Sequence, residues 1–154
     1  MALNYDDNEF RKVFEAFFKF NVKYIIIGGF AVNRHGFKRN TGDIDFYLKD
    51  SLENRRNLID ALAYLKYGHF EMLLTMQIVA GYCEIMLNNG IYADLMTDIK
   101  GLKQINFDTY YNEVIIDKQA NFEISYLNIN HLLQNKIATN SPKDIIDVME
   151  LKKL

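Results

Sequence analysis

The chain has 154 residues, of which 49% are hydrophobic and 14% aromatic, with 18 Lys and Arg against 20 Asp and Glu. This length predicts a single domain over residues 1–154, and the apolar content excludes long disorder. A formal net charge of −2 excludes a basic field over the whole surface, so a nucleic acid would need a local basic patch.

The sequence also predicts where the protein resides. One cysteine, Cys83, rules out an internal disulfide and favours a reducing compartment. The first residues are acidic, without the basic and apolar regions of a signal peptide, and no apolar run approaches the length of a membrane helix. We therefore expect a cytoplasmic protein with no membrane segment.

Hydrophobic periodicity predicts the elements of the first half. Apolar residues at spacings of three and four predict a helix over 7–20. A β-branched run predicts a buried strand over 23–27, which ends at Gly28-Gly29, and a short helix is expected over 30–34. A second strand follows over 43–49, and then a helix over 51–67 with Ser51 at its N-cap.

The second half has one undecided segment and one strong signal. Residues 70–79 are apolar without a clear period, which leaves helix and strand both open. Two alternating runs, 82–87 and 91–96, flank Asn88-Asn89-Gly90 and predict a hairpin. Strands over 113–117 and 122–126, and helices over 129–139 and from Ser141 onward, complete the chain. This order predicts an α/β or α+β fold, a mixed β-sheet flanked by helices with two C-terminal helices.

Two acidic residues stand out in the second strand. Asp43 and Asp45 are two residues apart, so both carboxylates project from one face, while Ile44 and Phe46 point toward the core. Two carboxylates held close on an apolar strand repel each other unless a cation lies between them. Oxygen ligands suit Mg²⁺ or Mn²⁺ better than Zn²⁺. The alternative is a strand end whose acids face water.

The glycine pair that ends the first strand allows a similar choice. Without a Cβ at Gly28 and Gly29, the backbone can approach a phosphate closely, and the free N–H groups of a helix that starts at Phe30 would point at that anion. The alternative is a tight turn with no ligand.

The combined pattern resembles a known superfamily. A strand, Gly28-Gly29, a short helix and then Arg39-Asn40-Thr41-Gly42-Asp43-Ile44-Asp45 resemble the nucleotidyltransferases, whose fold is that of the catalytic palm of DNA polymerase β. The segment 31–37, with His-Gly near its end, and the C-terminal elements 132–136 and 142–147 are similar to those of small bacterial members that include abortive-infection toxins of the AbiEii type. The resemblance covers about residues 24–151, although Asn140-Ser141 replaces a Gly-Arg of many relatives.

The resemblance implies an activity and a set of site residues. It implies a nucleotidyltransferase fold and a Mg²⁺-dependent enzyme that transfers an NMP from an NTP such as ATP to a hydroxyl, by a two-metal mechanism. Asp43 and Asp45 would ligate Mg²⁺ (or Mn²⁺), and Asp94 would complete the metal site and accept the proton of the acceptor hydroxyl. The nucleotide would be bound by Gly28, Gly29, Arg39, Thr41, Lys136 and Lys143, with Lys136 neutralising phosphate charge.

Several of these residues have simpler explanations. Asp94 would otherwise be a hairpin acid facing solvent, Arg39 and Thr41 parts of a surface turn, and Asp144 only a helix cap after Ser141. Lys143 and Asp147 would lie on a solvated helix face, or would contact the site residues without taking part in catalysis themselves.

The resemblance leaves the acceptor and the partner open. The acceptor would be a tRNA, a protein side chain or a small molecule, and the biological role part of a toxin–antitoxin or phage-defence system with an antitoxin or accessory protein. The alternative to the enzyme is a catalytically silent module of the same fold that binds a nucleotide or a partner.

Overall fold

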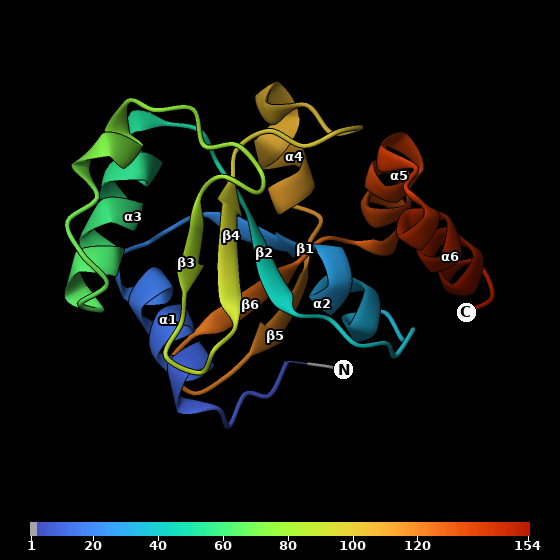
Figure 1. The fold of residues 1–154 in the computed structure, drawn as a ribbon, viewed down its shortest axis with the longest axis horizontal. Helices are drawn as coiled ribbons and strands as arrows, with labels where there is room; N and C mark the ends of the chain where they lie inside the picture. Colours follow the sequence, from blue (N-terminus) through green and yellow to red (C-terminus); the bar gives the residue numbers. More distant parts are fainter. Residues whose placement is uncertain (1–2) are drawn as a thin grey trace.

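A mixed sheet of six strands lies at the centre of the computed structural model, which describes residues 3–154. The predicted domain also includes residues 1 and 2, which lie outside the described residues. The strand order is β3-β4-β2-β1-β6-β5, and helices surround the sheet (Figure 1). The predicted fold class, a mixed sheet flanked by helices with two helices at the C-terminal end, is confirmed. Within residues 3–154, no helix has the length and hydropathy needed to cross a bilayer.

The elements of the first half follow the predicted order. They are α1 (Asn8–Lys19), β1 (Tyr24–Ile27), α2 (Gly28–Arg34), β2 (Asp43–Leu48) and α3 (Leu52–Tyr64). As predicted, Ser51 caps α3, and its hydroxyl accepts a hydrogen bond from the Asn54 N–H at 3.1 Å. Helix α2 starts two residues earlier than expected, because Gly28 has a φ of 68° and turns the strand directly into the helix.

The second half contains the undecided segment and one unexpected helix. Residues 70–79 form a 3₁₀ turn, η1 (Glu71–Leu74), and then irregular backbone up to Val79, which makes an isolated bridge with Asp98. A second 3₁₀ turn, η2 (Gln104–Asn106), leads into the unexpected helix α4 (Phe107–Tyr111), which is too short to show a periodic pattern. The remaining elements were predicted, with small differences at their ends: β3 (Glu84–Met86), β4 (Tyr92–Met96), β5 (Ile115–Lys118), β6 (Glu123–Tyr126), α5 (Ile129–Thr139) and α6 (Pro142–Leu151).

Strand β2 presents two different faces. Phe46 packs against Phe17 of α1, with ring centroids 5.2 Å apart, so α1 covers this face of the strand. Tyr47 points to the opposite face and contacts Phe107 of α4 at 5.1 Å. Because side chains alternate along a strand, Asp43 and Asp45 share the face of Tyr47. The two acids therefore project from the side of β2 that α1 does not cover.

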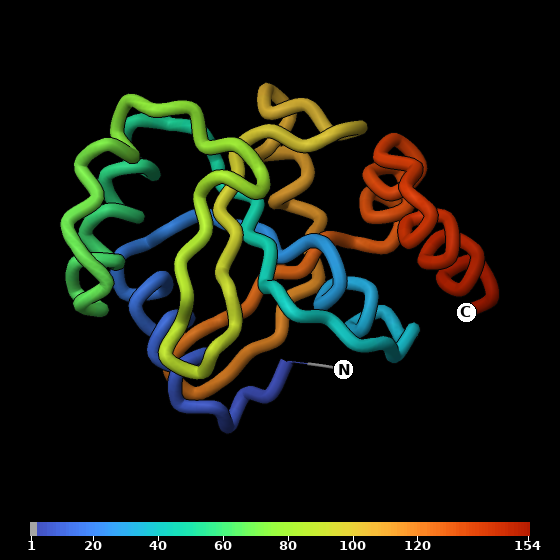
Figure 2. The backbone as a smooth tube through the Cα atoms, viewed as in Figure 1, coloured from blue at the N-terminus to red at the C-terminus, as the bar shows by residue number. Residues whose placement is uncertain are grey.

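The two C-terminal helices lie side by side at one end of the sheet. In Figure 2 they are the red segments, and the loop between α2 and β2 passes close to them. Helix α6 begins with the predicted cap: Ser141 Oγ accepts a hydrogen bond from the Asp144 N–H at 3.2 Å, and the Asp144 carboxylate accepts one from the Ser141 N–H at 3.2 Å. This capping box fixes the turn that joins α5 to α6.

Candidate functional site

The register of two parallel strands brings two of the predicted acids side by side. Asp45 on β2 and Asp94 on β4 are direct partners in the ladder, and two residues earlier Asp43 is the partner of Tyr92. Asp45 and Asp94 both line a pocket of about 630 Å³. Asp43 lies on the same face at the exposed start of β2, outside the lining of this pocket.

The sheet, two loops and residues of α2, α5 and α6 enclose the pocket. Its floor is the sheet at Ile27, Asp45, Asp94 and Met96, and the loops after η1 and β4 form its outer rim. Helix α5 contributes Asn135 and Thr139, and Asn135 Nδ2 donates a hydrogen bond of 2.8 Å to the carbonyl of Lys100 in the rim. The lining is Ile27, Gly28, Asp45, Val79, Ala80, Asp94, Met96, Asp98, Ile99, Lys100, Asn135, Thr139 and Asp144.

Asp45 is the most perturbed carboxyl group of the pocket. Burial, and then the negative charges of Asp94 and Asp43, raise its pKa to about 7, although Lys136 and Lys143 act in the opposite direction. A carboxyl group with such a pKa lacks enough compensating positive charge in its surroundings. The arrangement favours the approach of a cation.

Asp94 is held in place by a backbone donor. It is 9% exposed, and the N–H of Gly81 lies 3.1 Å from each of its two carboxylate oxygens. Burial raises its pKa; the Gly81 hydrogen bond opposes this shift, and the charges of Glu84 and Asp43 add to it. A carboxylate fixed in this way keeps the orientation that a ligand to a cation needs.

Glu84 is an acid of this site that the sequence analysis did not single out. It is the partner of Asp94 in the β3–β4 ladder, so Glu84, Asp94 and Asp45 form a row across three strands. The signal was present in the predicted hairpin, because Glu84 and Asp94 are equally distant from Asn89 in the turn. Glu84 is exposed at the edge of the sheet.

Both glycines of the turn are closely covered by neighbouring side chains. A Cβ on Gly28 would lie 2.1 Å from Asp45 Oδ2, and a Cβ on Gly29 would lie 2.3 Å from Thr41 Oγ1 and 3.2 Å from Arg39 Nη1. Gly28 therefore leaves the room that the Asp45 carboxylate occupies, and Gly29 allows the loop of Arg39 and Thr41 to pack against α2.

Two of the predicted phosphate-binding cations are already paired with carboxylates. Arg39 donates Nε and Nη2 to the two oxygens of Asp147, at 2.7 and 2.9 Å. Lys136 Nζ lies 2.9 Å from Asp147 and 3.1 Å from Asp144. Asp147 is fully buried, so of its two sequence interpretations the solvated face is wrong. Lys143, by contrast, is exposed at the start of α6.

The chemistry of these oxygen donors fits Mg²⁺. Among residues 3–154, no group of three or more His, Cys, Asp and Glu side chains is close enough together to hold a metal ion. Mg²⁺ is usually bound by one or two protein carboxylates together with substrate phosphates, and Asp45 and Asp94 offer two to one pocket. The residues present therefore suit a cation that arrives with a phosphate ligand.

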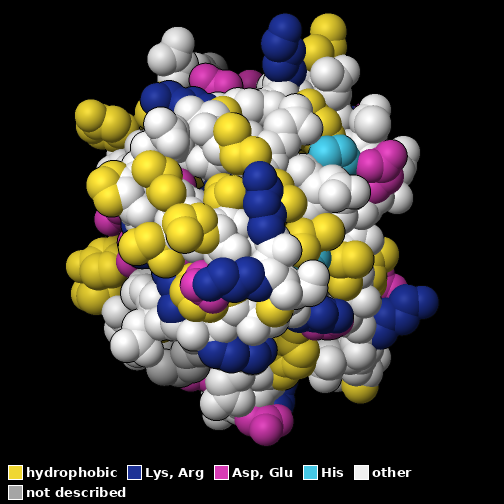
Figure 3. Space-filling view, turned by 90° about the vertical axis from the view of Figure 1, so that its right-hand side faces the viewer, with side chains coloured by type: hydrophobic (Ala, Val, Ile, Leu, Met, Phe, Trp, Pro, Cys, Tyr) yellow, Lys and Arg dark blue, Asp and Glu magenta, His cyan; other side chains and the backbone are white. Residues whose placement is uncertain are grey.

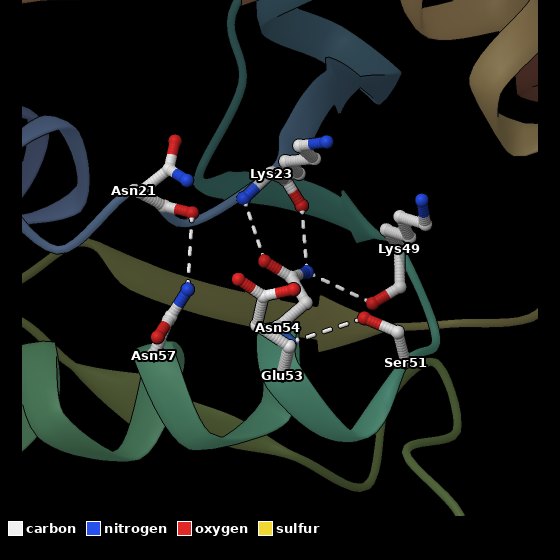
Figure 4. A pocket seen from close by; sticks show the side chains of 7 residues that line it. All are labelled: Asn21, Lys23, Lys49, Ser51, Glu53, Asn54 and Asn57. Atoms are coloured by element: carbon white, nitrogen blue, oxygen red, sulfur yellow. Dashed lines mark hydrogen bonds between the residues drawn. The ribbon is translucent and has the colours of Figure 1, made fainter.

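A smaller hollow of about 60 Å³ lies at the start of α3 (Figure 4), and neither Asp45 nor Asp94 lines it. Its central residue, Asn54, is 4% exposed and accepts a hydrogen bond from the Lys23 N–H at 2.7 Å. The Asn54 amide also donates to the carbonyls of Lys23 and Lys49, at 2.9 and 2.8 Å. These bonds satisfy backbone groups just before β1 and just after β2, which gives the hollow a structural explanation.

Comparisons with known proteins do not identify a family. No protein-family model matches the chain, and no curated protein matches it.

Proposed function

We propose that this chain is a Mg²⁺-dependent nucleotidyltransferase, which transfers a nucleoside monophosphate from an NTP to a hydroxyl acceptor. The observation that carries the proposal is the pairing of Asp45 with Asp94 on the wall of one pocket, beside the glycine turn at Gly28. The order of motifs along the chain, which resembles that of nucleotidyltransferases, supports the same conclusion.

The residues suggest a division of labour in the reaction. The acceptor oxygen attacks the α-phosphorus, the bond from this phosphorus to the bridging oxygen breaks, and pyrophosphate leaves with the electron pair. A carboxylate oxygen of Asp94 accepts the proton of the acceptor hydroxyl, and Gly28 leaves the room that the Asp45 carboxylate occupies beside the phosphates. Asp45 and Asp94 would hold Mg²⁺, which would supply the positive charge that phosphoryl transfer requires.

The acceptor and the biological role extend this proposal. A tRNA, a protein side chain or a small molecule each offers a suitable hydroxyl, and the resemblance favours a cytoplasmic toxin–antitoxin or phage-defence component. Among the described residues that line the pocket, Lys100 in the rim is the one Lys or Arg, and it lies alongside Asp98. A polyanionic acceptor would therefore need positive charge from elsewhere, such as Lys143 or an accessory protein.

One observation favours a second function, a silent module that binds a partner. The C-terminal helices expose four hydrophobic side chains, each 46–57% accessible: Ile137, Ile145, Ile146 and Met149. Figure 3 shows this side of the molecule, where hydrophobic and basic side chains are mixed. Exposed apolar side chains concentrated on one part of a surface are typical of interaction sites. Such a module would bind its partner whether or not Asp45 is intact.

The test is thermal unfolding with Mg²⁺ and each of the four NTPs. We compare the wild type with Asp45→Asn and with Asp60→Asn, which removes the same charge from an exposed position on α3. At one hundred times Kd, a ligand adds about 2.7 kcal/mol to the free energy of unfolding, which raises the Tm by about 5–10 °C for a domain of this size. The wild type and Asp60→Asn should show the rise, and it should require Mg²⁺.

Asp45→Asn should lose most of the rise, because it removes a ligand of the cation. An equal rise in Asp45→Asn, or none with any NTP at millimolar concentration, would contradict the proposal. The second outcome would favour the silent module.

A further inference from the structure

Asp147 connects three separate segments of the chain through one carboxylate. It projects from α6, is 0% exposed, and accepts two hydrogen bonds from Arg39 in the loop before β2 and one from Lys136 on α5. A carboxylate that is fully removed from water stays ionised only with direct cationic partners. The three segments are therefore held in one arrangement relative to each other.

The Arg39 arm of this arrangement reaches the glycine turn. A Cβ on Gly29 would lie 3.2 Å from Arg39 Nη1, and the Arg39 backbone N–H donates to the Asn33 side chain of α2 at 2.9 Å. Asn33 is itself fully buried. Arg39 is thus fixed to α2 by its backbone and to α6 by its guanidinium, directly above the first turn of α2.

The Lys136 arm reaches the wall of the pocket. Lys136 is 6% exposed, and the neighbouring Asn135 and the more distal Thr139 of the same helix line the pocket. The ammonium group of Lys136 also lies near enough to Asp45 to act on it electrostatically. The bond of Lys136 to Asp147 therefore helps to fix the position of α5 relative to Asp45 and Asp94.

We propose that Asp147 is a positioning residue for the nucleotide pocket, because it holds Arg39 against the glycine turn and holds the α5 wall opposite Asp45. The inference rests on the proposed function and adds a role for α6 in it. Loss of the Asp147 charge would free Arg39 and leave Lys136 with Asp144 as its carboxylate partner, so that the glycine turn and the α5 wall are no longer held to one common residue. NTP binding then weakens beyond what lower stability alone would cause.

The chain contains a matched pair that serves as the control. Arg34 donates Nε and Nη2 to Asp117 at 2.9 and 2.8 Å, with the same two-bond geometry as Arg39 and Asp147. This pair connects the far end of α2 to β5, and Tyr5 donates a further hydrogen bond to Asp117. Neither Arg34 nor Asp117 lines the pocket or covers Gly28 or Gly29. Asp117→Asn therefore breaks an ion pair of the same two-bond geometry, although a more exposed one, without touching the site.

The experiment measures the Tm without ligand and the affinity for Mg²⁺ with the NTP that stabilises the wild type most. The binding is measured by calorimetry at 15 °C, where all variants are folded by circular dichroism. Both Asp147→Asn and Asp117→Asn should lower the Tm, the former by about 10 °C because a buried pair is broken. Only Asp147→Asn should weaken binding, by tenfold or more. Arg39→Lys, which keeps the charge but loses the two-bond geometry, should weaken binding as well, and carries the test if Asp147→Asn does not fold.

A spectroscopic measurement separates positioning from simple support of the fold. In the wild type, the NMR signal of the Arg39 Nε–H should shift when the NTP binds, while that of the Arg34 Nε–H should not. Binding within twofold of the wild type in Asp147→Asn or Arg39→Lys, or an unmoved Arg39 signal, would overturn the inference. Absence of binding by the wild type would instead overturn the proposed function, on which this inference depends.

Discussion

Two groups of carboxylates adjoin the same pocket and differ in what surrounds them. Asp45 and Asp94 have a single backbone donor and other acids as their close neighbours, and their pKa values are raised. Asp144 and Asp147 receive hydrogen bonds from Lys136, and Asp147 also from Arg39. Burial alone would raise the pKa of both of the latter, but these bonds, with those of Thr139 and Ser141 to Asp144, outweigh it and lower the pKa.

The difference separates a binding group from a structural one. Burial acts in the same direction on all four acids, so direct side-chain donors decide the sign of each shift: Arg39 and Lys136 for Asp147, and Thr139, Ser141 and Lys136 for Asp144. The negative charges of Asp45 and Asp94 are not balanced by direct cationic partners in the fold. Those of Asp144 and Asp147 are balanced by Lys136 and Arg39. Acids of the same type, in the same region, therefore have opposite roles.

The largest expected effect is the pH dependence of stability without metal. Burial and the neighbouring acids raise the pKa of Asp45 to about 7. Between about pH 4 and pH 7 the folded protein keeps this proton and the unfolded chain releases it. The free energy of unfolding should therefore fall with rising pH across this range, by up to about 1.4 kcal/mol per pH unit.

Asp45→Asn should remove this decline and be more stable than the wild type at pH 8. Urea unfolding in EDTA at a series of pH values measures both. Asp144→Asn is the contrasting variant, because hydrogen bonds lower the pKa of Asp144 to about 2. The stabilising contribution of Asp144 is present above pH 4 and is lost as the pH falls toward 2. Asp144→Asn should therefore change how the free energy of unfolding depends on pH between about pH 4 and pH 2, and not above pH 4. A decline above pH 4 that persists unchanged in Asp45→Asn would contradict the comparison.

A smaller effect is expected from a methyl group in the glycine turn. Gly28→Ala combines a φ of 68° with a Cβ placed 2.1 Å from Asp45 Oδ2, and should cost about 1–3 kcal/mol while displacing the carboxylate. Gly81→Ala has a similar φ of 82° but no atom within 4 Å of its Cβ, so it should show only the backbone cost. Chemical denaturation of both variants gives the difference. Equal losses would mean that Asp45 moves aside freely.

The smallest effect concerns the cap that supports Asp144. Ser141→Ala removes the hydroxyl that caps α6 and donates to Asp144 at 2.7 Å, and should cost about 1 kcal/mol. Ser51→Ala removes the equivalent cap of α3, far from the pocket, and should cost a similar amount. Because Lys136 still holds Asp144, neither variant should alter NTP binding. A selective loss of NTP binding in Ser141→Ala would mean that Asp144 takes part in ligand binding, as proposed for Asp45 and Asp94, and is not only structural.

The sequence predicted the site residues on the β-strands better than those on the C-terminal helices. The alternation of Asp43, Ile44, Asp45 and Phe46 fixes which side chains share a face, and the Asn-Gly turn fixes the hairpin of Asp94. The burial of Asp147 gave no local signal. On α6 the isoleucines at 145 and 146 are about half exposed while Asp147 is buried, which reverses the usual pattern. The reason is Arg39, more than a hundred residues earlier, whose position depends on the tertiary fold.

Helix α4 and the 3₁₀ turn after α3 escaped prediction for another reason. Five residues at Phe107–Tyr111 and four at Glu71–Leu74 do not complete two turns, so no period can be detected. Their conformation depends on tertiary contacts, such as that of Phe107 with Tyr47.

The parallel pairing of β2 with β4 has a consequence for how the molecule acquires its site. Parallel neighbours need a long crossover, and here it consists of α3, the 3₁₀ turn and strand β3. During synthesis Asp45 leaves the ribosome well before Asp94, and the two meet only when this crossover has folded. The electrostatic repulsion between them therefore opposes a late step of folding, so divalent cations that bind both acids should accelerate the final docking of β4.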